Sequence, residues 1–259
     1  MSDDLLVRVE GGIAHVTFNR PQARNALTFA MYDRLEQFCA EAARTPDLRA
    51  IILAGAGGEA FAAGTDISQF RAFSSPEDAL AYEERIDRVV DALERCPVPT
   101  IAAIAGACTG AGTALAAACD LRIAAANMRF GIPIARTLGN CLSLANYARL
   151  AFLIGAARAK DIIFTARLVA AGEARAIGLV SEILPDADAL AARADELARL
   201  LAGHAPLTLR ATKEALLRVR PRVAKGEGDD LVLLCYMSQD FREGMTAFLE
   251  KRIPRFQGK

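Results

Sequence analysis

The stretch PVPTIAAIAGACTGAGTALAAACD, residues 97–120, decides how this chain folds, and it carries no charge before Asp120. Its first half, 99–105, is short, apolar and preceded by prolines, which is typical of a buried strand. Its second half, 113–119, is rich in alanine and predicts a buried helix. The glycines between them predict a turn that points backbone N–H groups at whatever lies above the helix N-terminus. Such groups suit an oxygen that carries negative charge.

Other structural interpretations of this stretch fit its sequence less well. It is long enough to span a membrane, but it is mostly alanine and glycine, begins with prolines and has no companion span. A dinucleotide-binding fingerprint needs a third glycine where Leu115 stands, and a phosphate-binding loop needs Lys-Ser or Lys-Thr after a glycine. A tight turn that only lets the strand and the helix pack closely remains the alternative for this stretch taken alone.

Composition narrows the class of protein. A chain of 259 residues can bury a large core, and its 31 basic residues balance its 31 acidic ones, so no net field attracts nucleic acid. The six cysteines lie far apart in the sequence, which is typical of a protein in a reducing compartment. The chain has only two histidines, His15 and His204, and this small number argues against a metal cluster or a Ser-His-Asp triad. The N-terminus, MSDDLLVRVE, lacks the apolar core of a signal peptide. We expect a cytoplasmic protein that binds no metal, nucleic acid or membrane.

Apolar periodicity predicts strands that alternate with helices, followed by a chain that is nearly all helix. The expected strands are 5–10 and 13–18 around the hairpin turn Gly11-Gly12, then 48–54, 99–105, 121–125 and 179–184. The expected helices are 28–43, 75–95, 113–119, a pair within 143–164, a short helix from 172, and 186–203, 206–223 and 228–250, with loops over 54–70 and 127–140. This order predicts an α/β core over residues 1–195 and a helical region over residues 196–259.

Five motifs in register resemble those of the crotonase superfamily, also called the enoyl-CoA hydratase/isomerase family. They are FNRPQARNAL (18–27), FAAGTDISQF (61–70), IAGACTGAGTALAAACD (104–120), FGIPIARTLG (130–139) and EGMTAFLEKR (243–252). The resemblance implies a spiral of ββα turns with an all-helical C-terminal region that builds homotrimers, often paired into hexamers. It also implies acyl-CoA thioester substrates, with coenzyme A as part of the substrate and no bound cofactor.

The resemblance also implies positions for the site. The backbone amides of Thr65 and Ala111 would bind the thioester oxygen as it becomes an enolate. Substrate contacts would come from Arg24, Asn25, Ala26, Ala63, Asp66, Ile67, Gly110, Ala114 and Ile134, and from Phe248 and Lys251 of a neighbouring subunit. Two of these residues have structural alternatives. The Asp66 carboxylate is expected to cap the helix that follows it, and Lys251 suits the negative end of the last helix.

The family pattern breaks at two positions. Hydratases of this family carry glutamates where this chain has Ala114 and Ile134, and each general acid or base is worth roughly 10²–10⁴ in rate. The residues that would transfer protons to and from the substrate carbon atoms are therefore unassigned. Arg136 or Asn140 could hold the carboxylate of a malonyl-type thioester in a decarboxylase, although a surface ion pair or subunit contact for Arg136 and a turn for Asn140 are the alternatives. A catalytically silent CoA-thioester binder is the remaining possibility.

Overall fold

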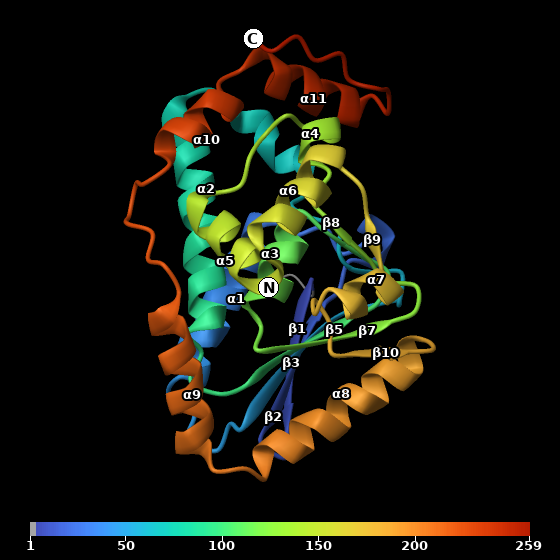
Figure 1. Cartoon of the computed structure of the whole chain (residues 1–259), viewed down its shortest axis with the longest axis vertical. Coiled ribbons are helices and arrows are strands. Elements are labelled where there is room, and N and C mark those ends of the chain that lie inside the picture. The colour runs from blue at the N-terminus through green and yellow to red at the C-terminus, as the bar shows by residue number, and fades with distance from the viewer. Residues whose placement is uncertain (1–3) are drawn as a thin grey trace.

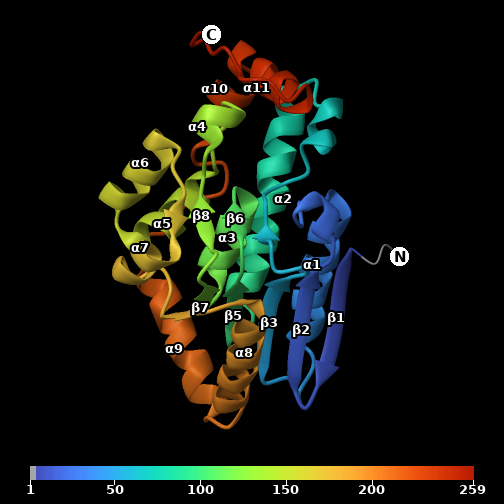
Figure 2. The same ribbon diagram turned by 90° about the vertical axis from the view of Figure 1, so that its right-hand side faces the viewer.

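The computed structural model describes residues 4–259, so residues 1–3 of the expected core lie outside it. The strands are β1 (Leu5–Glu10), β2 (Ile13–Phe18), β3 (Ala50–Gly55), β4 (Ala60–Ala62), β5 (Thr100–Ile104), β6 (Ala107–Thr109), β7 (Leu121–Ala125), β8 (Arg129–Gly131), β9 (Val169–Ala170) and β10 (Glu182–Leu184). They form a six-stranded sheet in the order β1-β2-β3-β5-β7-β10 and a four-stranded sheet in the order β4-β6-β8-β9. The first strands of the six-stranded sheet lie side by side in Figure 2.

The helices account for the rest of the regular structure. The α-helices are α1 (Phe29–Ala42), α2 (Pro76–Glu94), α3 (Ala111–Ala118), α4 (Ile134–Thr137), α5 (Leu144–Ile154), α6 (Ala156–Thr165), α7 (Ala171–Ala176), α8 (Ala187–Ala202), α9 (Pro206–Val219), α10 (Asp229–Tyr236) and α11 (Gln239–Leu249), and the 3₁₀-helices are η1 (Pro21–Ala23) and η2 (Ile67–Ala72). None of the helices in residues 4–259 combines the length and the apolar character needed to cross a bilayer.

The chain repeats one unit, a strand in each sheet followed by a helix. The first such unit is β3, β4 and α2, and the second is β5, β6 and α3. Because β3, β5 and β7 are parallel neighbours in one sheet and β4, β6 and β8 are parallel neighbours in the other, each turn of the chain stacks on the one before it. The β–β–α order that the resemblance implied is therefore present.

Alternating side chains of the six-stranded sheet enter two separate cores, as the two-residue period of a strand requires. In β3, Ile51 and Leu53 belong to the main core, whereas Ile52 packs on the other face against α8. Helix α8 covers that face along its length, from Leu190 to Ala198 (Figure 1). The expected division after residue 195 thus falls inside α8.

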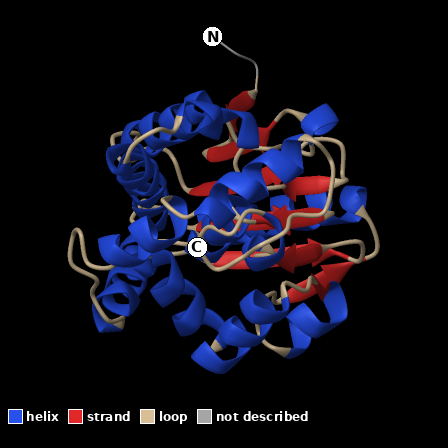
Figure 3. Ribbon diagram, turned by 90° about the horizontal axis from the view of Figure 1, so that it is seen from above, coloured by secondary structure: helices blue, strands red, loops and turns tan. Residues whose placement is uncertain are grey.

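The opposite face of the sheet is covered by several helices. Helix α2 contacts α1, α3 and α10, so its buried face looks into the centre of the molecule. Figure 3 shows the strands gathered in the middle with helices around them, and Figure 1 places α10 and α11 at the end farthest from α8. Helix α11 contacts η2 and α4, which follow β4 and β8 of the four-stranded sheet.

Several expected boundaries were wrong. The glycine-rich loops contain the three-residue strands β4 and β6, and the expected loop over 127–140 contains β8 and α4. The expected helix over 228–250 is two helices, because Ser238 caps α11 by accepting a hydrogen bond from the Phe241 amide over 3.0 Å. The helix expected over 206–223 ends at Val219, ahead of Pro221.

Candidate active site

The first glycine loop follows β4 and is paired with the segment that precedes α1. The Leu27 amide donates to the Gly64 carbonyl over 2.8 Å, and the Leu27 carbonyl accepts from the Asp66 amide over 2.9 Å. In such a parallel bridge the residue between the two partners, Thr65, turns its own N–H to the opposite side. Gly64 allows this path because its φ is +96°, a value that side chains disfavour.

The second glycine loop follows β6 and leads into α3. Gly110 has a φ of +54°, and Ala111 is the first residue of the helix. The first N–H groups of a helix have no partner within it, and they carry the positive end of the helix dipole. The Thr113 amide is satisfied locally, since it donates to the Gly110 carbonyl over 3.0 Å. Ala111 thus presents a backbone N–H beyond the helix end.

The two loops touch at their glycines. A Cβ atom placed on Gly64 would lie 3.8 Å from the Cα of Gly110 and 4.0 Å from the amide nitrogen of Ala111. Thr65 and Ala111 both line one cavity of about 470 Å³, and its surface is mostly apolar. The backbone hydrogen bonds that residues 4–259 form outside their helices and strands include none in which the Thr65 or the Ala111 amide is the donor. Two free N–H groups therefore meet at one cavity.

This cavity brings together most of the residues that the sequence singled out. It is lined by Arg24, Ala26, Ala63, Thr65, Asp66, Ile67, Gly110, Ala111, Ala114, Ile134, Asn140 and Phe248. The resemblance implied that Phe248 comes from a neighbouring subunit, but α11 of the same chain brings it to this cavity, where 53% of it is exposed.

Three expected site residues do not line the cavity. Asn25 is fully buried, and its amide donates to the carbonyls of Ala60 (2.7 Å) and Ala56 (3.0 Å), so it holds the loops together. Arg136 is exposed, because α4 turns Ile134 inward and Arg136 outward. Lys251 is also exposed, just after the end of α11. The carboxylate-holding role expected for Arg136 is therefore not supported by its place in this chain.

Asp66 has a structural task as well as a place at the cavity. Its carboxylate accepts a hydrogen bond from the Ser68 amide over 3.1 Å, which caps η2, and it pairs with the Arg20 guanidinium at 3.0 Å. The expectation that this carboxylate caps the following helix is confirmed.

The two positions where the resemblance implied glutamates, Ala114 and Ile134, face the same cavity. Ala114 and Ile134 are each 7% exposed, and Pro133 and Leu138 line the wall beside them. This part of the wall is mostly apolar and holds no carboxylate, and the hydroxyl of Thr137, which also lines it, donates to the Pro133 carbonyl over 3.0 Å.

Sequence reasoning missed a cluster of hydroxyl groups behind the first glycine loop. The Thr65 hydroxyl lies 2.7 Å from the hydroxyl of Tyr32 on α1 and 2.7 Å from that of Tyr82 on α2. All three side chains are buried, and burial raises the pKa of both tyrosines. The phenols thus stay neutral and fix the loop that carries the Thr65 amide.

Glu83 is the second group that sequence reasoning missed. It is 7% exposed and lines the cavity from α2. Its Oε1 accepts from the Tyr236 hydroxyl over 2.6 Å, and its Oε2 accepts from the Ser143 amide over 3.2 Å. Burial raises the pKa of Glu83 to about 8, the Asp87 charge adds to this rise, and the two hydrogen bonds oppose it. A carboxyl group that exchanges its proton near neutral pH therefore borders the cavity.

Asn140 extends this group. Its Nδ2 donates to the Tyr236 hydroxyl over 3.0 Å, which makes a chain from Asn140 through Tyr236 to Glu83. Its Oδ1 is buried and has no hydrogen-bond partner among residues 4–259. Asn140 lies in the irregular segment after α4 and is not assigned to a turn, and the expectation of a turn residue also leaves out this side-chain contact.

The sequence did contain a signal for Glu83. The buried face of α2 runs through Ala79, Tyr82, Ile86 and Val90 at helical spacing, and Glu83 falls on that same face. A carboxylate on the apolar face of an amphipathic helix is a departure that indicates a function or a buried partner.

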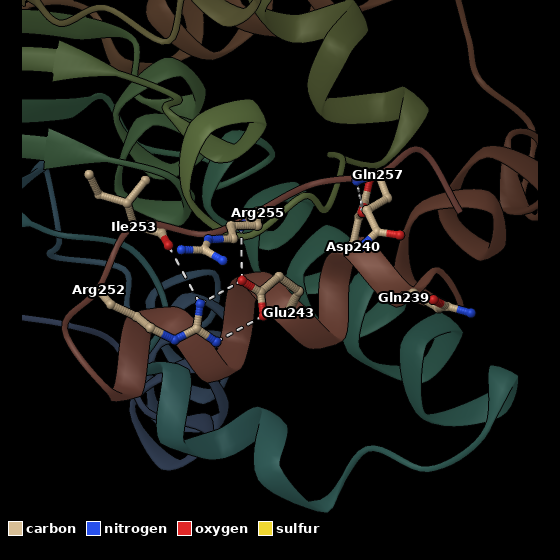
Figure 4. A pocket seen from close by; sticks show the side chains of 7 residues that line it. All are labelled: Gln239, Asp240, Glu243, Arg252, Ile253, Arg255 and Gln257. Carbon is tan, nitrogen blue, oxygen red and sulfur yellow. Dashed lines mark hydrogen bonds and ion pairs between the residues drawn. The ribbon is translucent and has the colours of Figure 1, made fainter.

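A larger cavity, of about 880 Å³, lies between α11 and the C-terminal tail (Figure 4). Its two acidic side chains are already paired. Arg252 contacts Glu243 over 2.6 Å, and Asp240 accepts from the Gln257 amide over 2.6 Å. These contacts fasten the tail to α11. Within residues 4–259 no three His, Cys, Asp or Glu side chains are grouped to hold a metal ion.

Comparison with known proteins identifies the family. Residues 8–259 match the family model described as Enoyl-CoA hydratase/isomerase. The short-chain-enoyl-CoA hydratase of Clostridium acetobutylicum is 34% identical over 253 residues, which cover 96% of each chain.

Solved structures agree with this. An enoyl-CoA hydratase/carnithine racemase from Magnetospirillum magneticum has a TM-score of 0.80 at 35% identity and covers 100% of this chain and 97% of its own. A methylmalonyl-CoA decarboxylase in complex with 2-nitronate-propionyl-CoA has a TM-score of 0.88 at 28% identity, with both chains covered fully at 100%. The expected fold class, ββα turns followed by a helical region, is confirmed by these neighbours. The chain therefore belongs to the enoyl-CoA hydratase/isomerase family, the crotonase superfamily.

Proposed function

We propose that this enzyme processes acyl-CoA thioesters by stabilising a thioester enolate between the backbone amides of Thr65 and Ala111. The observation that carries this proposal is the contact of the two glycine loops, which leaves two unpaired N–H groups at one mostly apolar cavity. An enolate places a full negative charge on one oxygen, and two preorganised donors bind that charge without any proton transfer. One such donor is typically worth roughly 3 kcal/mol of transition-state stabilisation.

Coenzyme A would enter as part of the substrate, with no separate bound cofactor. Arg24 lies exposed where the cavity opens, and its guanidinium suits a phosphate of the nucleotide. The small residues Ala26 and Ala63 let a ligand approach the backbone beside it. Phe248 and Lys251 would complete the pocket, with Phe248 packing against the ligand from α11.

We assign the reaction to the hydratase/isomerase class and leave the usual pair of glutamates out of the mechanism. Ala114 and Ile134 cannot move a proton, so efficient hydration through two carboxylates at those positions is not expected. Proton transfer to and from the substrate carbon atoms therefore needs another acid/base group. The contacts of the two amides with the enolate oxygen do not depend on which residue supplies that group.

A decarboxylase is the second candidate, because a methylmalonyl-CoA decarboxylase is among the similar structures. Such an enzyme needs a donor for the substrate carboxylate near the enolate. Asn140 lines the cavity, and its Nδ2 would have to leave the Tyr236 hydroxyl to donate to that carboxylate, whereas Arg136 is exposed and does not line the cavity. A protein that binds CoA thioesters without turnover is the third candidate.

One experiment separates these candidates. The purified protein is incubated in heavy water with butyryl-, vinylacetyl-, crotonyl- and methylmalonyl-CoA, and the products are analysed by mass spectrometry. We expect deuterium at the α-carbon of butyryl-CoA, since this step needs only enolate formation. Loss of carbon dioxide from methylmalonyl-CoA would favour the decarboxylase. Binding of all four thioesters without any change would favour the silent binder.

We also propose a homotrimer, or a hexamer made of two trimers, built through the helical region after residue 195. Large apolar side chains there and on α6 are exposed in the single chain, among them Phe164, Leu207, Val219 and Leu234. Large apolar side chains that stay exposed in the single chain support burial against other copies of it. Light scattering on the eluting protein tests this, and a monomer would contradict it. The six free cysteines support a reducing compartment such as the cytoplasm, which cell fractionation tests.

A further inference from the structure

We infer that Glu83 is the catalytic acid/base of this site and moves a proton to and from the carbon chain of an acyl-CoA thioester. This inference rests on the function proposed above and supplies the group that Ala114 and Ile134 lack. Glu83 borders the same cavity as the Thr65 and Ala111 amides, and it does so from α2, an element that does not carry the usual glutamates.

Helix α2 ties this carboxyl group to the oxyanion loop. Tyr82 and Glu83 are neighbours on α2 and both line the cavity. The Tyr82 hydroxyl lies 2.7 Å from the Thr65 hydroxyl, so the helix that carries the carboxyl group also fixes the residue that presents one amide. The acid/base group and the charge-binding group are thus parts of one rigid unit.

The hydrogen bonds of Glu83 orient it and leave it able to react. A carboxylate has about four acceptor positions, two on each oxygen. Tyr236 occupies one position on Oε1, and the Ser143 amide occupies one on Oε2. Each oxygen therefore keeps a lone pair that can take a proton from carbon.

Burial, with the charge of Asp87 adding to it, makes Glu83 a stronger base than an exposed glutamate. Asp87 lies one turn along α2 and repels a negative charge on Glu83. The acids nearby are neutral. Burial, together with the Cys235 hydrogen bond for Cys141, raises their pKa values, and the charge of Glu83 raises them further; these acids are Tyr32, Tyr82, Cys141, Tyr147 and Tyr236. The nearby cation Arg149 contacts Asp91 and Glu94 instead. A base of raised pKa is well matched to the weak acidity of a carbon next to a thioester.

The reaction that a single carboxylate can complete is a shift of a carbon–carbon double bond. A Glu83 oxygen forms an O–H bond as the Cα–H bond of a β,γ-unsaturated acyl thioester breaks. The electron pair of that bond delocalises onto the thioester oxygen, where the two amides bind it. The Glu83 proton then returns to the γ-carbon, the double bond moves to the α,β position, and the carboxylate is regenerated. No water, metal or co-reactant is consumed.

Asn140 and Tyr236 are positioning residues in this scheme. While Glu83 is ionised, Tyr236 donates to it and accepts from Asn140 Nδ2. Once Glu83 is protonated, the Tyr236 hydroxyl can accept from Glu83 and donate to an oxygen on the other side. The Asn140 Oδ1 atom, buried and without a partner among residues 4–259, becomes that acceptor when the amide turns over.

The test compares Glu83→Gln with Glu84→Gln, whose side chain is the exposed neighbour on α2 and pairs with Lys225. Each protein is given butyryl-CoA in heavy water to follow α-deuteration, and vinylacetyl-CoA to follow its conversion to crotonyl-CoA. Binding of butyryl-CoA is measured by calorimetry, and circular dichroism checks folding. We expect both rates to fall about 100-fold or more in Glu83→Gln with binding retained, and to stay unchanged in Glu84→Gln.

The outcomes separate the two proposals. If the unmodified enzyme deuterates butyryl-CoA and Glu83→Gln does so equally fast, the role of Glu83 is overturned while the enolate function stands. If the unmodified enzyme transfers no proton with any thioester, both proposals fail. Should Glu83→Gln misfold, Glu83→Asp replaces it. This variant keeps the charge but withdraws the carboxylate by one methylene, and an undiminished rate there would also overturn the role.

The pH profile distinguishes a catalytic Glu83 from a structural one. The rate should rise with pH and level off above about 8, where Glu83 is ionised. Tyr236→Phe removes a hydrogen bond that lowers the pKa of Glu83, so its profile should move to higher pH. A profile that is flat from pH 6 to 9 (about the range over which a group of this pKa titrates), or one that Tyr236→Phe leaves in place, would contradict the assignment.

Discussion

The Thr65 hydroxyl lies 2.7 Å from the Tyr82 hydroxyl, and this contact joins the first glycine loop to helix α2. Thr65 lines the cavity, and its side-chain hydroxyl contacts two buried tyrosines, Tyr32 and Tyr82. One residue thereby serves the site through its main chain and the fold through its side chain.

Thr65→Val should destabilise the protein and slow enolate formation. Valine has the shape of threonine without its hydroxyl, so Tyr32 and Tyr82 would each lose a buried partner, at a cost of about 1–3 kcal/mol for each unsatisfied group. Urea unfolding measures the loss of stability, and α-deuteration of butyryl-CoA measures the activity. Thr65→Ser keeps the hydroxyl and is the matched control. Equal stability of the valine and serine variants would show that the hydroxyl contacts contribute little.

Ala111→Pro should abolish one oxyanion contact while leaving the fold intact. Proline suits the first position of a helix and lacks the N–H that Ala111 presents. We expect α-deuteration to fall about 10²–10³-fold, as for the loss of one such donor elsewhere. Ala111→Ser retains the N–H and controls for the change of side chain. If the proline variant is folded and as active as the serine variant, the Ala111 amide does not bind the enolate.

Local pattern was enough to predict much of this fold. In β3 the alternation of Ile51, Ile52 and Leu53 between two cores follows from the geometry of a strand, and Ser75 caps α2 where its sequence context places a helix start. The strands β4, β6 and β8 were not predicted, because three residues are too few to show a period and their pairing comes only from stacking of successive turns.

The backbone part of the candidate site could be predicted from the sequence. The side chains that meet there from distant parts of the chain could not. The glycines before Thr65 and Ala111 signal two turns, and the resemblance to the crotonase superfamily then implied which amides they present. Glu83 accepts a hydrogen bond from Tyr236, which is 153 residues away in the sequence, and no local sequence pattern predicts such a contact. An acidic residue on the buried face of a helix was the only local sign of it.

Glu83→Gln should change the pH dependence of stability in a defined direction. The pKa of Glu83 is raised to about 8 in the folded protein by burial, so the folded state retains a proton that the unfolded state releases near its ordinary value. As the pH is raised from about 4.5 to about 8, the free energy of unfolding of the unmodified protein should therefore fall relative to that of the variant, by a few kcal/mol in total. Above about pH 8 the difference should stay constant.

Denaturant unfolding of both proteins across this range checks the linkage. Glu84→Gln serves as the control again, since Glu84 is exposed. A constant difference in stability between Glu83→Gln and the unmodified protein at every pH would mean that Glu83 ionises as an ordinary carboxylate.

The final prediction concerns the buried ion pairs that support the other end of α2. Glu94 accepts from Arg149 Nε over 3.1 Å and from Arg220 Nη2 over 2.8 Å, and the side chains of Glu94 and Arg149 are 7% and 2% exposed. Glu94→Ala would leave Arg149 buried with only Asp91 and Asn146 as partners, and we expect a loss of about 3–5 kcal/mol. Glu214→Gln, which breaks an exposed pair with Arg218, should leave the free energy of unfolding nearly unchanged.

Acid titration gives a second readout of the same contact. Burial alone would raise the pKa of Glu94, but the hydrogen bonds and charges of Arg220 and Arg149 outweigh it, so its pKa is lowered in the folded protein. The stability that Glu94 supplies is therefore fully present above the ordinary pKa of a glutamate and is lost as the pH falls through the lowered value. The gap in unfolding free energy between the unmodified protein and Glu94→Gln, which cannot ionise, should thus narrow on acidification below about pH 4.5. A gap that widens there would mean that the two arginines do not hold Glu94 in its charged form.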